Sequence, residues 1–134
     1  MPHIAVWDDS MRSSTDLRTK QFAPLKLSAT KDFVTECAAA TDQVYGIVQS
    51  KPNVGDAMRL AIKGRWSAKV DGSGTAIAIG DLLGPNAAGS MLVKKTAAGA
   101  NVCARALDVC TISAGIIDVM VDCGVIAGVV TLAS

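Results

Sequence analysis

The sequence contains few of the side chains on which enzymes depend. Its 134 residues include one histidine, His3, and one glutamate, Glu36. A hydrolytic triad requires a base held beside a nucleophile, and nothing near the start of the chain would hold His3 in place. Asp118 and Asp122 lie about 13 Å apart along a predicted strand, which is too far for one metal ion. We therefore expect no enzymatic activity, no catalytic residue, no metal and no cofactor.

Aromatic residues and net charge are equally scarce. Aromatic side chains make up 4% of the chain, and the formal charge is +1. A nearly neutral chain has no general electrostatic attraction to nucleic acid or anionic lipid. Acidic residues lie where a secretory signal would need an apolar run, and the apolar residues 124–134 are too few to span a bilayer. We expect no nucleic-acid or membrane partner, and synthesis in a cytoplasm.

The four cysteines form no C-x-x-C pair and no familiar zinc-binding spacing with His3. Free cysteine often behaves as a small buried hydrophobe. We expect Cys37, Cys103, Cys110 and Cys123 to be free, buried thiols, and disulfides are the alternative.

What the chain does contain is short apolar stretches separated by turn signals, which is typical of β structure in a single domain. Residues 58–70 alternate, and the apolar face carries Met58, Leu60, Ile62, Gly64, Trp66, Ala68 and Val70. The opposite face carries Arg59, Lys63, Arg65 and Lys69, together with Ala61 and Ser67. This basic face either contacts a partner or faces water and neighbouring acids.

A second alternation, Ile117, Val119 and Val121 against Asp118, Met120 and Asp122, predicts another half-exposed strand. The sequence "DGSG" at 71–74 predicts a hairpin turn. Residues 35–44 fit either a helical turn or a strand and loop. The fold class is predicted to be all-β, a small barrel or sandwich with little helix.

Residues 1–26 are rich in charge and poor in hydrophobic periodicity, which favours an extended N-terminal arm before a β-barrel domain over residues 27–134. The arm nevertheless holds large apolar groups, so we expect it to become ordered on a partner. Its candidate contact residues are Ile4, Val6, Trp7, Arg12, Leu17, Arg18 and Phe22.

Across residues 30–112, the order and spacing of six short segments resemble the small capsid decoration, or cement, proteins of tailed bacteriophages. The segments are Gly46–Gln49 before a Pro/Gly loop, Gly55–Ala57, Gly64-Arg65, Ile79–Leu83, Ala88-Gly89 and Ala104–Leu107.

The resemblance implies a compact β-barrel protein on the outer surface of the virion capsid. It would bind the major capsid protein, commonly as trimers at three-fold and local three-fold positions, without catalysis. The apolar content near the C-terminus exceeds the needs of one small barrel and favours a homotrimer. The candidate trimer residues are Val125, Ile126, Val129, Val130 and Leu132.

Two other functions are open. A virion-displayed glycan-binding domain for host attachment would need exposed aromatic platforms, which are scarce here. A biotinyl or lipoyl carrier domain would use Lys94 or Lys95, although neither lysine has the neighbours that mark a modified lysine in those families.

Overall fold

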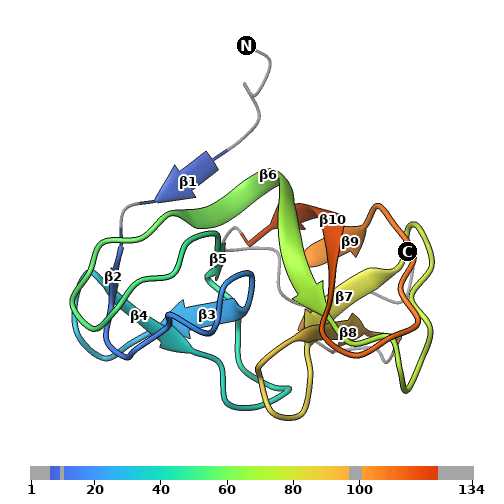
Figure 1. Cartoon of the computed structure of the whole chain (residues 1–134), viewed down its shortest axis with the longest axis horizontal. Coiled ribbons are helices and arrows are strands. Elements are labelled where there is room, and N and C mark those ends of the chain that lie inside the picture. The colour runs from blue at the N-terminus through green and yellow to red at the C-terminus, as the bar shows by residue number, and fades with distance from the viewer. Residues whose placement is uncertain (1–6, 10, 97–100, 124–134) are drawn as a thin grey trace.

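The computed structural model describes residues 7–9, 11–96 and 101–123, and these contain ten β-strands and no helix (Figure 1). The prediction of an all-β fold is confirmed. The strands are β1 (Trp7–Asp9), β2 (Arg12–Ser13), β3 (Pro24–Leu27), β4 (Phe33–Glu36), β5 (Gly46–Val48), β6 (Leu60–Val70), β7 (Leu82–Pro85), β8 (Leu92–Lys94), β9 (Ala104–Ala106) and β10 (Gly115–Asp122).

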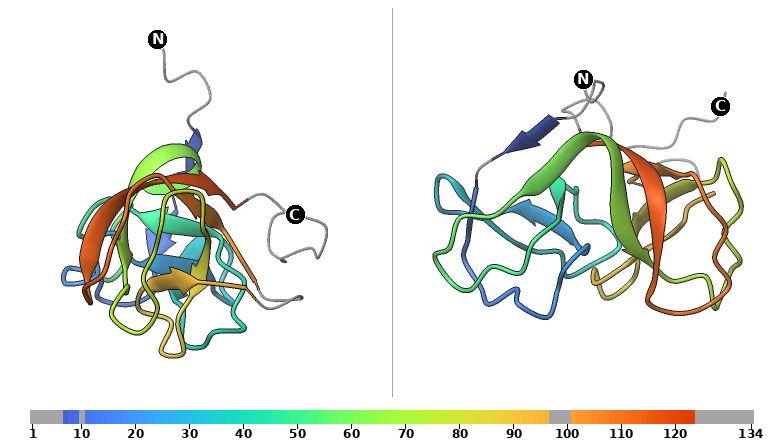
Figure 2. Two further views of the ribbon diagram at one scale, coloured as in Figure 1. Left: turned by 90° about the vertical axis from the view of Figure 1, so that its right-hand side faces the viewer. Right: turned by 45° about the horizontal axis from the view of Figure 1, so that its top comes forward.

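Five strands close into a barrel in the order β6–β10–β9–β7–β8. All neighbours in this ring are antiparallel except β6 and β8, which meet in parallel at Val70 and Leu92. The remaining strands extend from the other half of β6, which pairs with β5 and then leads to β3, β4 and β2. Figure 2 shows this second half of the molecule beside the barrel.

Strand β6 joins the two halves because it is long and sharply curved (Figures 1 and 2). Gly64, near its middle, has a φ of 109°, a conformation that side chains other than glycine rarely adopt. Residues 60–61 pair with β5, whereas residues 63–70 pair with β10. One strand therefore contributes to two separate cores.

The larger core fills the barrel, and the smaller core lies beneath the N-terminal strands. The larger includes Ala61, Ala68, Val70, Leu83, Leu92, Val119 and Val121. The smaller comprises Met11, Leu17, Leu25, Val34, Val48, Met58 and Leu60. Leu60 and Ala61 point to opposite faces of β6 and are both fully buried. The simple alternation predicted for this strand consequently fails at Ala61, which was placed on the charged face.

The predicted division at residues 26 and 27 does not match the packing. The boundary falls inside β3, and Leu17 and Leu25 are fully buried in the smaller core. The backbone amide of Ser14 also donates to the carbonyl of Val34 at 2.9 Å. Residues 11–26 are thus part of the folded body, because their apolar side chains supply a core that the barrel strands alone cannot complete.

Other local predictions have mixed outcomes. Strand β10 alternates strictly between buried and exposed residues, as predicted. Residues 33–36 form β4, and the chain then continues as a loop, so the strand-and-loop alternative is correct. The hairpin predicted at 71–74 is wrong: β6 and β7 are not paired, and β7 pairs with β8 and β9.

Candidate functional site

An open groove of about 320 Å³ lies where the loop between β2 and β3 meets the end of β6 and the start of β10. One wall comes from the loop between β2 and β3 and carries Arg18, Thr19, Gln21 and Phe22. The other lining residues are Lys51 from the β5–β6 loop, Lys69 from β6 and Ile116 from β10. The groove therefore combines three cationic side chains with two large apolar ones.

Phe22 is held at this groove by its backbone. Its φ of 71° lies in the left-handed region, which costs a residue other than glycine about 1–3 kcal/mol. Two hydrogen bonds fix this conformation: the Phe22 amide donates to the Val48 carbonyl at 2.7 Å, and the Phe22 carbonyl accepts from the Lys69 amide at 2.8 Å. These two bonds fasten the β2–β3 loop to the end of β5 and to the C-terminal end of β6.

Gln21 and Gln49 extend this attachment. The Gln21 side-chain amide donates to the Gln49 carbonyl at 3.0 Å, and the Gln49 side-chain amide donates to the Ser67 carbonyl at 2.9 Å. The second bond satisfies a backbone carbonyl of β6 that β5 and β8 do not reach, and the first satisfies the carbonyl of Gln49, just after β5. The wall of the groove that the β2–β3 loop forms is consequently held by several hydrogen bonds and not by a single one.

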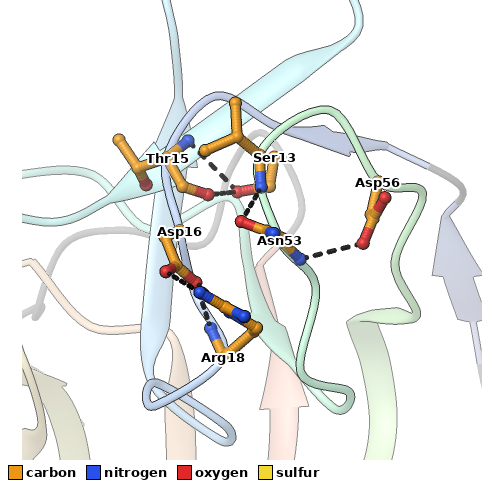
Figure 3. Close-up of polar contacts among 7 residues, drawn as sticks. Ser13, Thr15, Asp16, Arg18, Asn53 and Asp56 are labelled. Atoms are coloured by element: carbon orange, nitrogen blue, oxygen red, sulfur yellow. Dashed lines mark hydrogen bonds and ion pairs between the residues drawn. The ribbon is translucent and has the colours of Figure 1, made fainter.

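Arg18 is positioned by Asp16, as Figure 3 shows. Its guanidinium donates to both carboxylate oxygens, at 3.0 and 2.8 Å. The hydrogen bonds from Arg18 lower the pKa of Asp16 to about 2, so this carboxylate remains charged at neutral pH. The hydrogen bond with Asp16 and the charge of Asp16 raise the pKa of Arg18, and Asp56, on the neighbouring loop, adds a smaller attraction. The positive charge of Arg18 is therefore largely balanced by the carboxylates beside it.

Lys51 and Lys69 differ from Arg18 in this respect. Within residues 11–96 and 101–123, no carboxylate lies within ion-pair distance of either lysine. Lys51 is exposed, and Lys69 is half-buried opposite Ile116 in the β6–β10 pair. The net positive charge of the groove comes from these two lysines.

The four-cation face predicted for residues 59–69 is not one surface. The Arg59 guanidinium lies over the Trp66 ring, 5.4 Å from its centroid, and Arg65 pairs with Asp118 at 2.9 Å. Lys63 is exposed on the part of β6 that pairs with β1. Only Lys69 reaches the groove, so the curvature of β6 separates residues that a flat strand would align.

The candidate contact residues of the expected arm also separate. Arg18 and Phe22 line the groove, and Arg12 is exposed on β2. Leu17 must be corrected from a contact residue to a core residue, because its side chain is fully buried. Trp7 lies on β1. Ile4, Val6 and the candidate trimer residues Val125, Ile126, Val129, Val130 and Leu132 fall outside the described residues.

Sequence reasoning missed Lys51 and Ile116. Ile116 precedes the predicted strand 117–122 by one residue, and extending the alternation backwards would have placed it on the exposed face. Lys51 carried no signal, because it lies in a loop whose distance from β6 depends on the tertiary fold.

The side chains needed for the alternative functions are not well placed. The four aromatic side chains within residues 11–96 and 101–123 are only partly exposed, and the Arg59 guanidinium lies over the Trp66 ring. Lys94 ends β8 and pairs with Asp81 at 3.5 Å rather than standing on a hairpin tip. The described residues contain no group of three or more potential metal ligands, and no helix among them could span a membrane.

Comparison with known proteins gives a match at the level of the fold. No family model matches the sequence, and no curated protein matches it. Among solved structures, the chain is similar to the head fiber gp8.5 N base in bacteriophage phi29, with a TM-score of 0.62 and 15% sequence identity. The similarity covers 88% of this chain and 95% of that one. The two chains share a fold across almost their whole lengths.

Proposed function

We propose that this protein is a structural component of a tailed-phage head and binds the outer surface of the capsid as a decoration, or cement, protein. The observation that carries the proposal is the shared fold with a phage head fiber base, which spans nearly the whole of both chains. The resemblance of residues 30–112 to decoration proteins rests on sequence segments and is the support for the decoration role in particular.

The mechanism follows from where such a protein binds. A site formed only where neighbouring shell subunits meet exists in the assembled shell and not in free subunits. Each bound copy therefore stabilises the assembled shell and leaves the free subunits unaffected. A homotrimer at a three-fold position would bring three binding surfaces together at high effective concentration. Modest contacts per copy would then give firm attachment without catalysis.

The test is sedimentation of purified protein with shells that lack it. We expect the protein to pellet with intact shells at a saturating ratio, to remain soluble with unassembled capsid protein, and to raise the temperature at which shells rupture. A protein that stays in the supernatant with intact shells would contradict the proposal.

A further inference from the structure

We propose that the groove between Phe22 and Lys69 is the docking site for an acidic segment of the capsid protein, with the segment's carboxylates on Lys51 and Lys69 and an apolar side chain on Phe22 and Ile116. This inference rests on the proposed function, because it takes the capsid protein as the partner. It adds the chemistry by which that partner is bound.

Charge complementarity is the first reason for this choice. Lys51 and Lys69 have no carboxylate partner within the described residues, whereas Arg18, the third cation of the groove, is paired with Asp16. Two unpaired cations at one groove favour a ligand that brings carboxylates. An acidic partner segment would complete the ion pairs that this chain leaves unmade.

The apolar side chains argue for a polypeptide rather than a simple anion. Ile116 is 49% exposed on the outer face of β10, beside Lys69, and Phe22 keeps a strained backbone conformation that presents its side chain at the groove. Aromatic anchors contribute strongly to binding when a partner excludes water from them. Strain of this kind is frequently found at binding sites.

The surrounding charges argue against a nucleic acid. Arg18 is already paired with Asp16, so the groove offers only Lys51 and Lys69 to a ligand, whereas a nucleic acid is bound through many such cations along its backbone. The whole chain carries a formal charge of only +1, which gives little attraction to a phosphate backbone. A short segment with separated carboxylates fits the groove better.

The first experiment compares charge-reversed variants of the full chain in the shell-binding assay. Lys51→Glu should weaken binding about fivefold per copy, because it removes one attraction and adds one repulsion. Lys31→Glu is the matched control: Lys31 is also an exposed lysine, changes the net charge equally and lies outside the groove. Binding by Lys31→Glu should equal that of the wild type.

A second variant tests the apolar contact. Phe22→Asn removes the aromatic ring and replaces it with a residue that tolerates a positive φ, so the loop should keep its conformation. We expect weaker shell binding with an unchanged circular dichroism spectrum. Wild-type shell affinity in both Lys51→Glu and Phe22→Asn would overturn the groove as docking site while leaving the proposed function intact.

A titration without shells separates the two proposals. The probe is a synthetic peptide that alternates glutamate and leucine, added to isotope-labelled protein and followed by amide chemical shifts. Shifts at Phe22, Lys51 and Lys69 that a lysine–leucine peptide does not produce would support the groove chemistry, even if binding to shells failed and the proposed function fell. Absence of these shifts, or larger ones with a short oligothymidylate, would overturn the assignment to an acidic polypeptide.

Discussion

Replacement of Leu17 by alanine tests whether the N-terminal segment is part of the folded body. In an extended arm Leu17 would be fully exposed. In the structure it is fully buried and packs in the smaller core with Leu25, Val48 and Leu60. Its amide also donates to the Pro52 carbonyl at 2.9 Å, so the site has little freedom to collapse around a cavity. Removing a leucine side chain from such a site costs about 3 kcal/mol, in a range of roughly 2.7–5 kcal/mol.

This cost is large beside the 5–15 kcal/mol by which small domains are typically stable. With a urea dependence of about 1.5 kcal/mol per molar, the unfolding midpoint of Leu17→Ala should fall by about 2 M. Leu27→Ala is the matched control, since Leu27 is 56% exposed on β3 and its truncation should cost well under 1 kcal/mol. Equal midpoints for the two variants would refute the packing of residues 11–26 described above.

Three further predictions concern the thiols and one tight turn. Native protein should react slowly with thiol reagents and denatured, unreduced protein should release four thiols, because all four cysteines are buried and free; release of only two would reveal a disulfide. Burial raises the pKa of Cys37 from 9.0 to about 12, so the unfolded thiol ionises first. The contribution of Cys37 to the free energy of unfolding should be fully present below pH 9 and should be lost as the pH rises toward 12. A urea midpoint that stays constant over that pH range would contradict this. Gly89→Ala should destabilise the protein by about 2–4 kcal/mol, since φ is 76° and the added Cβ would lie 2.3 Å from the Cys37 backbone carbon. Gly74→Ala, with no atom within 4 Å of its added Cβ, should change the urea midpoint little.

The sequence was sufficient to predict the strands that carry a regular pattern. The alternation in β10 survives intact because one face meets the barrel core and the other meets solvent along its whole length. The alternation in β6 predicts a strand, yet it does not show that the strand bends at Gly64 or that Ala61 is buried on the second face. An alternating pattern predicts one buried face of a strand, and it does not predict a strand that buries both faces at different points along its length.

The groove could be predicted only in fragments. Arg18, Phe22 and Lys69 were each singled out, but in two unrelated sets, and nothing in the sequence placed them together. Their proximity depends on the hydrogen bonds from Phe22 to Val48 and Lys69, which join residues more than twenty positions apart. Leu17 was misassigned for the same reason: a segment without periodicity can still bury single side chains when loops cover a core.

Electron microscopy of shells that lack this protein, before and after addition of the purified full chain, tests the proposed function most directly. The account predicts new density on the outer surface at three-fold and local three-fold positions, with the barrel fitted so that the groove of Phe22, Lys51 and Lys69 faces the capsid protein. Shells whose outer surface is unchanged at saturating protein concentration would contradict it.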